Sequence, residues 1–346
     1  MKSLFSFFLF LSIVRPCFAT TKEYVEIRNG EKLLTGIFQF RDESSPVIYF
    51  LQGFTCMSIG NLSENHPYNK LVDGFLEKGF SVFQLEKSGF GKFSNSVLCA
   101  DIGFAEEVTD FEQGYEYLKK RFKGLENKIF IFGHSLGGSI APLIATKFKP
   151  SGIVVYGAGI RSWSDYLIEV TRYQGIWNGR DYEENGLLLA KLKDYYYRWF
   201  NNGESLMEIC RDTAAARVFS DLWGYSGTGH YFLGRHELFF RELNSVNYYG
   251  IWKWVSCPVY AIYGEADVEA IYPDDMKTIS EIINHYKPGT GKFLILEGTD
   301  HLFAKTGTIE NVIKLRKAGE YGNFIYENFN PAIIDEVTNF FHQSLE

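Results

Sequence analysis

Several features are rare or absent in the sequence, and each of these absences excludes a class of protein. Proline occurs only 9 times in 346 residues and charged residues make up 22%, so the chain is neither collagen-like nor a disordered, highly charged segment. Acidic residues (42) outnumber Lys and Arg (35), and no long basic block occurs. The sequence therefore lacks the basic patch that is typical of proteins that bind nucleic acid or anionic lipid. Beyond the first residues, no stretch is long and apolar enough to predict a membrane span.

The N-terminus carries the one long apolar run. Lys2 precedes eleven mostly apolar residues, Leu4 to Val14, a length typical of the central region of a signal peptide and too short to cross a bilayer. Small residues at Cys17 and Ala19 suit a signal peptidase, so we expect residues 1–19 to be removed, with Thr20 first in the mature chain. The expected location is therefore secreted or periplasmic.

Export makes disulfide bonds possible, and only 5 cysteines occur in the chain. They show no CxxC or Cys/His spacing of a zinc site, and we expect no metal. Cys56 and Cys99 each follow a predicted strand by a few residues, in loops that should share one edge of a sheet, and they are the preferred disulfide pair. Cys210 and Cys257 are expected to be buried thiols, and the sequence does not determine whether they are paired.

Short apolar runs alternate with helical periods along most of the chain. A hairpin at Asn29-Gly30 comes first, followed by β-branched and aromatic runs such as VIYFL and KIFIF, which are typical of strands buried on both faces. This alternation predicts an α/β fold with a doubly wound, mostly parallel sheet. We expect residues 20–158 and 257–346 to form this core. Residues 159–256 lack this alternation of strands and helices and contain all 6 tryptophans. They are expected to form an inserted helical, aromatic-rich cap.

A G-x-S-x-G pentapeptide around Ser135 is the strongest chemical signal. The run KIFIF leads directly into it and a helical pattern starting at Leu136 leads out of it. Such a strand–turn–helix junction presents a serine hydroxyl at the carboxyl edge of the sheet, and small neighbours allow the close approach of strand and helix. The sequence therefore predicts that Ser135 is a nucleophile, rather than merely the cap of a helix.

A serine nucleophile needs a base, and the base needs an acid to orient it. Among 7 histidines, His301 directly follows the last predicted strand and is expected at the same sheet edge as Ser135, whereas His134 is expected to point away from the serine. Asp267 follows the preceding predicted strand and is the expected acid. The order Ser135, Asp267, His301 is that of nucleophile-elbow hydrolases. The reserve candidates for the acid are Glu265, Asp300 and Asp165.

Backbone N–H groups are expected to stabilise an oxyanion beside the serine. Leu136, at the start of the helix, supplies one donor, and Phe54, in the turn Leu51-Gln52-Gly53-Phe54, is a candidate for the second.

With these motifs, residues 23–346 resemble an α/β-hydrolase with a helical cap, most similar to the serine aminopeptidase-like and lipase/esterase-like branches. The resemblance implies Ser135 as nucleophile, Asp267 as acid, His301 as base, and Phe54 and Leu136 as oxyanion donors, with no cofactor. Gln52-Gly53 departs from the common His-Gly turn.

Four functions remain open. An exported carboxylic-ester hydrolase acting on small or lipid-like esters is favoured, because an aromatic cap suits an apolar acyl or aryl group. An aminopeptidase would need a carboxylate pair in the cap for the substrate ammonium, for which the available residues are Glu204, Glu208, Asp212 and Glu237. An acyltransferase or thioesterase would use the same triad. A catalytically silent binding protein would be expected to lack a triad member. The oligomeric state is not determined by the sequence.

Overall fold

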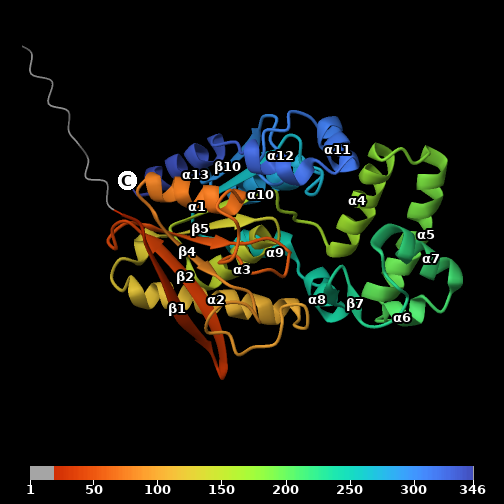
Figure 1. Cartoon of the computed structure of the whole chain (residues 1–346), viewed down its shortest axis with the longest axis horizontal. Helices are drawn as coiled ribbons and strands as arrows, with labels where there is room; N and C mark the ends of the chain where they lie inside the picture. The colour runs from red at the N-terminus through yellow and green to blue at the C-terminus, as the bar shows by residue number, and fades with distance from the viewer. Residues whose placement is uncertain (1–18, 346) are drawn as a thin grey trace, which may run out of the picture.

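A computed structural model describes residues 19–345, in which one eight-stranded sheet forms the centre of the fold (Figure 1). Its spatial order is β1-β2-β4-β3-β5-β6-β9-β10, and every neighbouring pair is parallel except the two that involve β2. The strands are β1 (Thr21–Asn29), β2 (Lys32–Phe40), β3 (Val47–Leu51), β4 (Ser81–Leu85), β5 (Ile129–His134), β6 (Gly152–Tyr156), β9 (Val259–Gly264) and β10 (Gly291–Leu296). The predicted doubly wound, mostly parallel sheet with an antiparallel opening hairpin is confirmed.

Helices cover both faces of this sheet. On one face lie α2 (Phe104–Arg121), α3 (Leu136–Phe148), α9 (Tyr248–Trp254) and α10 (Pro273–Tyr286). On the other lie α1 (Pro67–Glu77) and α13 (Ala332–Gln343). Strand β3 shows the reason: Tyr49 packs toward α2 and donates a hydrogen bond to the Phe111 carbonyl (2.9 Å), whereas its neighbours Ile48 and Phe50 pack toward α1. Alternate residues of a central strand thus enter two cores, so the strand is apolar throughout.

The segment between β6 and β9 forms the aromatic insertion. It comprises α4 (Trp163–Trp177), α5 (Tyr182–Phe200), α6 (Leu206–Ile209), α7 (Thr213–Trp223), the short hairpin β7 (Tyr231–Phe232) and β8 (Arg235–His236), and α8 (Glu237–Asn244). These elements project from one end of the sheet (Figure 1) and enclose rings of their own, including the fully buried Trp199. Helix α9, later in the same segment, instead packs against α3 and α10 beside the sheet.

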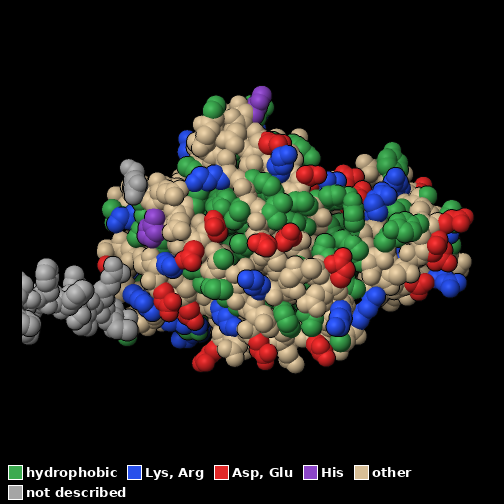
Figure 2. Space-filling model, turned by 90° about the horizontal axis from the view of Figure 1, so that it is seen from above, with side chains coloured by type: hydrophobic (Ala, Val, Ile, Leu, Met, Phe, Trp, Pro, Cys, Tyr) green, Lys and Arg blue, Asp and Glu red, His purple; other side chains and the backbone are tan. Residues whose placement is uncertain are grey.

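Some elements lie outside the sequence-based expectations. The helices α11 (Ile309–Ala318) and α12 (Tyr321–Glu327) follow β10, and the 3-10 turn Glu126–Lys128 precedes β5. The expected signal peptide, residues 1–19, lies outside the described residues except for Ala19. Within residues 19–345, none of the helices combines the length and the apolarity that crossing a bilayer requires. Figure 2 shows one face of the molecule, on which red and blue charged side chains are interspersed with green apolar ones.

A disulfide joins Cys56 to Cys99, the pair expected from the sequence. It links the loop after β3 to the loop between β4 and α2, with a Cα–Cα distance of 5.8 Å. Cys210 is half-buried and Cys257 is buried, and both are free thiols.

Thiol alkylation of the unfolded, unreduced protein should therefore modify Cys210 and Cys257 and spare Cys56 and Cys99. Peptide mass spectrometry before and after reduction measures this directly, and the two free cysteines serve as the internal control. Alkylation of Cys56 or Cys99 without reductant would contradict the bond.

Candidate active site

The turn from β5 into α3 holds Ser135 in a conformation that few side chains tolerate. Its φ is 53° and its ψ is −122°, outside the regions that L-residues ordinarily adopt. Two glycines allow this turn to pack closely. A Cβ on Gly137 would lie 2.1 Å from the Leu51 carbonyl oxygen, and one on Gly133 would lie 2.6 Å from the Gly137 oxygen. The G-x-S-x-G spacing thus follows from backbone crowding.

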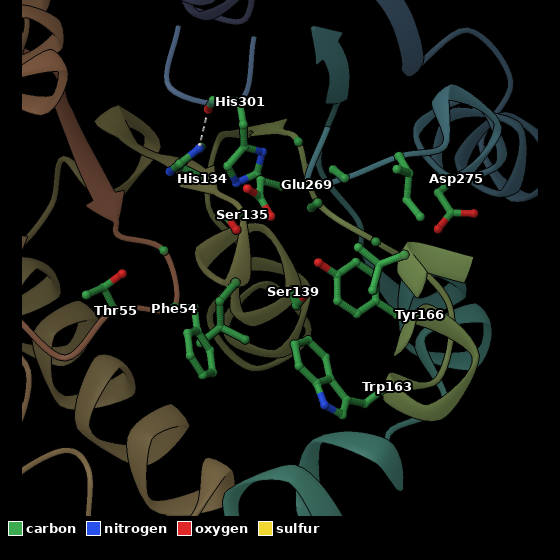
Figure 3. Close-up of a pocket in the computed structure, with 18 of the residues that line it drawn as sticks. Phe54, Thr55, His134, Ser135, Ser139, Trp163, Tyr166, Glu269, Asp275 and His301 are labelled. Carbon is green, nitrogen blue, oxygen red and sulfur yellow. Dashed lines mark hydrogen bonds between the residues drawn. The ribbon is translucent and has the colours of Figure 1, made fainter. Parts of the chain in front are cut away.

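His301 and Asp267 meet through a hydrogen bond of 2.7 Å between Nδ1 and Oδ2. The fully buried Asp267 is itself fixed, because its Oδ1 accepts the backbone N–H groups of Glu269 (2.8 Å) and Ala270 (2.9 Å). Since a carboxylate accepts, Nδ1 of His301 donates and Nε2 is the nitrogen left for a proton transfer. The imidazole lies above Ser135 in the same pocket (Figure 3).

The surroundings of His301 set its basicity. Burial alone would lower the pKa of this imidazole, but the charge and hydrogen bond of Asp267, with smaller contributions from Glu269 and Asp300, raise the pKa above its ordinary value. The site therefore favours taking up a proton at His301.

The N–H groups expected to receive an oxyanion lie beside Ser135. Leu136 is the first residue of α3, and Phe54 belongs to the loop after β3. A Cβ on Gly53 would lie 3.3 Å from the Cβ of Ser135, so this loop passes directly over the serine. The N–H of Gly53 donates to the Tyr68 hydroxyl (3.1 Å), whereas within residues 19–345 the N–H of Phe54 has no backbone acceptor.

His134, which the sequence predicts to point away from the serine, lines the same pocket. Its Nε2 donates to the backbone oxygen of His301 (2.9 Å), so its Nδ1 accepts from the Tyr68 hydroxyl (2.7 Å), which in turn accepts the Gly53 N–H. Burial, helped by the nearby His301, lowers the pKa of His134 well below its ordinary value and keeps it neutral. A hydrogen-bonded chain thus connects the loop after β3 with the loop that carries His301. The histidine inside the pentapeptide was the only sequence signal of this chain.

The three other candidates for the acid make hydrogen bonds to groups other than the His301 imidazole. Glu265 accepts the Gly298 N–H (2.9 Å), and Asp165 pairs with the Ser162 hydroxyl (2.6 Å) at the start of α4. Asp300 accepts two backbone N–H groups of its own loop (3.0 and 2.9 Å), and burial raises its pKa to about 6.

The pocket over Ser135 has a volume of about 590 Å³ and is lined by both apolar and charged side chains. The apolar side chains include Phe54, Trp163, Leu167, Leu243 and Tyr248. The charged side chains are paired: Arg161 with Asp275 (2.7 Å), Arg316 with Glu269 (2.7 Å), and Glu169 with Arg172, which lies outside the lining (2.9 Å). Glu269 lies beside His301 and Ser135, whereas Asp275 lies farther away, beyond Tyr166 (Figure 3). In residues 19–345 no group of three or more His, Cys, Asp or Glu side chains is placed to hold a metal ion.

Gly157, at the end of β6, supports the Asp267–His301 pair. Its φ is +57°, and a Cβ there would lie 2.9 Å from Oδ2 of Asp267 and 3.0 Å from Nδ1 of His301. A side chain at this position would enter the space of their hydrogen bond.

Gly157→Ala should therefore separate the two groups and lower the pKa of His301, because burial then acts without its compensating carboxylate. NMR titration of the histidine signals measures this. Gly319→Ala is the matched control: its φ is +72° with nothing near the added carbon. Both variants should lose about 1–2 kcal/mol of stability from the left-handed backbone, but only the first should move the titration. An unchanged titration in Gly157→Ala would contradict the support role.

Comparison with known proteins gives a family match and a shared fold. A family model described as serine aminopeptidase, S33, matches residues 56–211. Esterase EstD of Thermotoga maritima is 21% identical over 278 residues, which cover 80% of this chain and 57% of EstD; the chain thus spans little more than half the length of this relative.

Solved structures agree in fold along nearly the whole chain. Esterase Pf2001 of Pyrococcus furiosus aligns with a TM-score of 0.53 at 14% identity, covering 94% of this chain and 92% of that one. A carboxyl esterase of Bacillus coagulans aligns with a TM-score of 0.51 at 17% identity, covering 93% and 99%. Residues 56–211 thus match the serine aminopeptidase, S33, family model, and the chain shares the α/β-hydrolase fold of these esterases.

Proposed function

We propose that the chain is an exported serine hydrolase that cleaves carboxylic esters through an acyl-enzyme on Ser135. The observation that carries this proposal is the Asp267–His301 hydrogen bond (2.7 Å), held above a serine in a strained turn within a largely apolar pocket. The esterases of similar fold and the EstD match support an activity of this class.

Each group then has a distinct role. Nε2 of His301 takes the hydroxyl proton as Ser135 Oγ attacks the acyl carbon, and Asp267 stabilises the resulting imidazolium. The N–H groups of Leu136 and Phe54 donate to the negative oxygen of the tetrahedral intermediate. The imidazolium returns its proton to the leaving alcohol, and a water molecule, activated by the same nitrogen, releases the acid.

The mixed lining supports an ester with an apolar part and a polar part. Trp163, Leu243 and Tyr248 give an acyl or aryl group an apolar surface. The polar part would contact the paired charges. Because Asp275, Glu269 and Glu169 are each matched by a guanidinium, these side chains offer hydrogen bonds rather than a strong net charge.

The local contacts of the cap carboxylates argue against the aminopeptidase alternative. The four cap carboxylates considered for a substrate ammonium are used locally: Glu204 pairs with Arg198, Glu208 and Asp212 cap the helices α6 and α7, and Glu237 binds His230. None of the four lines the pocket over Ser135. A neutral ester requires no such anchor.

The disulfide supports export, because such bonds persist in oxidising compartments. The apolar N-terminal run would act as the signal peptide.

A fluorophosphonate probe should label the wild-type protein at Ser135, and p-nitrophenyl esters should be hydrolysed. Ser135→Ala should lose labelling and reduce turnover by about 10⁴-fold or more, with little change in thermal stability. Ser139→Ala, one turn along α3, is the matched control. Wild-type protein that is neither labelled nor active on esters would overturn the proposal, whereas turnover of aminoacyl-naphthylamides alone would favour the peptidase.

The pH profile should report His301. Only the neutral imidazole can act as base, so kcat/KM should fall as the pH decreases through the pKa of His301. That pKa lies above the ordinary value of a histidine. In Asp267→Asn, no carboxylate offsets the effect of burial on His301, so the pKa of His301 should fall and the profile should move to lower pH. The rate should also fall by about 10⁴-fold, because the imidazole is no longer correctly oriented. Initial rates on one p-nitrophenyl ester measure both effects, and an unmoved profile in Asp267→Asn would contradict the assignment.

A further inference from the structure

Three charged side chains form a buried cluster behind the loop that follows β3. Lys87 follows β4, Glu107 lies in α2 and Arg235 begins β8 in the inserted segment. Their side chains are 0%, 2% and 1% exposed. The Glu107 carboxylate accepts from Lys87 Nζ (3.1 Å) and from Arg235 Nη1 (2.5 Å). Elements distant in the sequence thus meet at a single carboxylate.

Such a cluster is expensive to bury and contributes little net stability. Removing charges from water costs several kcal/mol per ion, and apolar replacements of buried ion networks are often as stable or more so. Burial lowers the pKa of Lys87 to about 7 even though Glu107 opposes the change. The cluster is therefore better explained by what it holds than by the stability it adds.

What it holds is the backbone beside Ser135. Lys87 Nζ donates to the carbonyl oxygen of Gly53 (2.6 Å) and to that of Phe54 (3.1 Å). Arg235 also donates to the Phe54 oxygen, through Nη2 (2.5 Å) and Nε (3.2 Å). Two consecutive carbonyl groups of this loop are thus drawn to the same side by buried cations.

The direction of these carbonyl groups determines the direction of an N–H group. A trans peptide is planar, and its N–H points opposite to its C=O; no cis peptide occurs in residues 19–345. The Gly53 carbonyl and the Phe54 N–H belong to one peptide. With that carbonyl held by Lys87, the Phe54 N–H must point away from the cluster. Ser135 lies next to the loop, 3.3 Å from the position of a Gly53 Cβ, and Phe54 lines the pocket.

We propose that Lys87, Glu107 and Arg235 are positioning residues that turn the Phe54 N–H toward the oxyanion formed at Ser135, an inference that rests on the proposed function. Lys87 fixes the peptide that carries the donor, Arg235 fixes the next carbonyl, and Glu107 holds both cations in place. Arg235 comes from the hairpin of the inserted segment, so this donor is correctly aimed only when that hairpin is seated on the core.

Lys87→Met tests the proposal without leaving an unpaired charge, because Arg235 and Glu107 still balance each other. A single oxyanion donor is worth about 10²–10³-fold in kcat, so a donor that is present but misdirected should lower kcat on a p-nitrophenyl ester by about 10–100-fold. KM should stay within about 2-fold, because the N–H acts mainly on the transition state. The inhibition constant of an aryl boronic acid, which forms a tetrahedral adduct on the serine, should rise by a factor similar to the loss in kcat.

Lys32→Met is the control for the loss of a largely buried lysine. Lys32 on β2 pairs with Asp110 (2.6 Å) and Glu106 (2.8 Å) and makes no hydrogen bond to Gly53 or Phe54. Asp110 keeps its hydrogen bonds from Asn29 (3.0 Å) and Ser88 (2.7 Å), so the loss of Lys32 should leave kcat unchanged. Arg235→Gln gives a second, independent measurement, since Lys87 and Glu107 remain paired. Arg235→Lys should recover part of the lost kcat.

A folded Lys87→Met or Arg235→Gln protein that keeps wild-type kcat, or that loses kcat without weaker boronate binding, would overturn the positioning role. Circular dichroism and the melting temperature establish folding, and either variant suffices if the other does not fold. Failure of the proposed function gives a different result, because the wild-type protein would then neither react with the fluorophosphonate nor hydrolyse esters.

Discussion

The close contact between the β5–α3 turn and the end of β3 is the constraint on which the site depends. The Leu51 carbonyl lies where a side chain of Gly137 would be, and Ser135 accepts a positive φ to make the turn. This contact sets the serine beside the loop that carries Phe54 and at the edge where β9 and β10 deliver Asp267 and His301. In a parallel sheet, the carboxyl ends of the strands meet at one edge, so loops far apart in the sequence converge there.

Two polar networks hold those loops from opposite sides. The neutral His134 and the Tyr68 hydroxyl connect the loop after β3 to the backbone of His301. The cluster of Lys87, Glu107 and Arg235 holds the carbonyl oxygens of the same loop from behind. Buried polar groups of this kind tolerate few alternative arrangements, because each lost partner leaves an unsatisfied group in a dry interior. The loop next to the serine is consequently held at the Gly53 N–H and at the carbonyl oxygens of Gly53 and Phe54.

The sequence was informative where one local pattern determines one structure. Apolar β-branched runs predicted the central strands, and the pentapeptide predicted the turn at Ser135, because backbone crowding leaves a signature of glycines. The structure brings Asp267 and His301 together as expected, although their catalytic role stays a prediction. No sequence pattern predicted that Glu107 and Arg235 are buried. A charged residue on a helix or in a hairpin is usually exposed to solvent, and these two are buried only because three elements distant in the sequence pack together. The link that His134 makes was hidden for a different reason, because its partners, the Tyr68 hydroxyl and the His301 backbone oxygen, come from distant parts of the chain.

The disulfide makes the durability of the protein depend on its surroundings. It closes a loop spanning 43 positions, for which the loss of chain entropy in the unfolded state corresponds to about 4 kcal/mol, a substantial share of the roughly 5–15 kcal/mol typical of folded domains. A copy retained among cytosolic reductants would lack that contribution and open more often to proteases. A copy in an oxidising compartment would keep the bond and the stability that it adds.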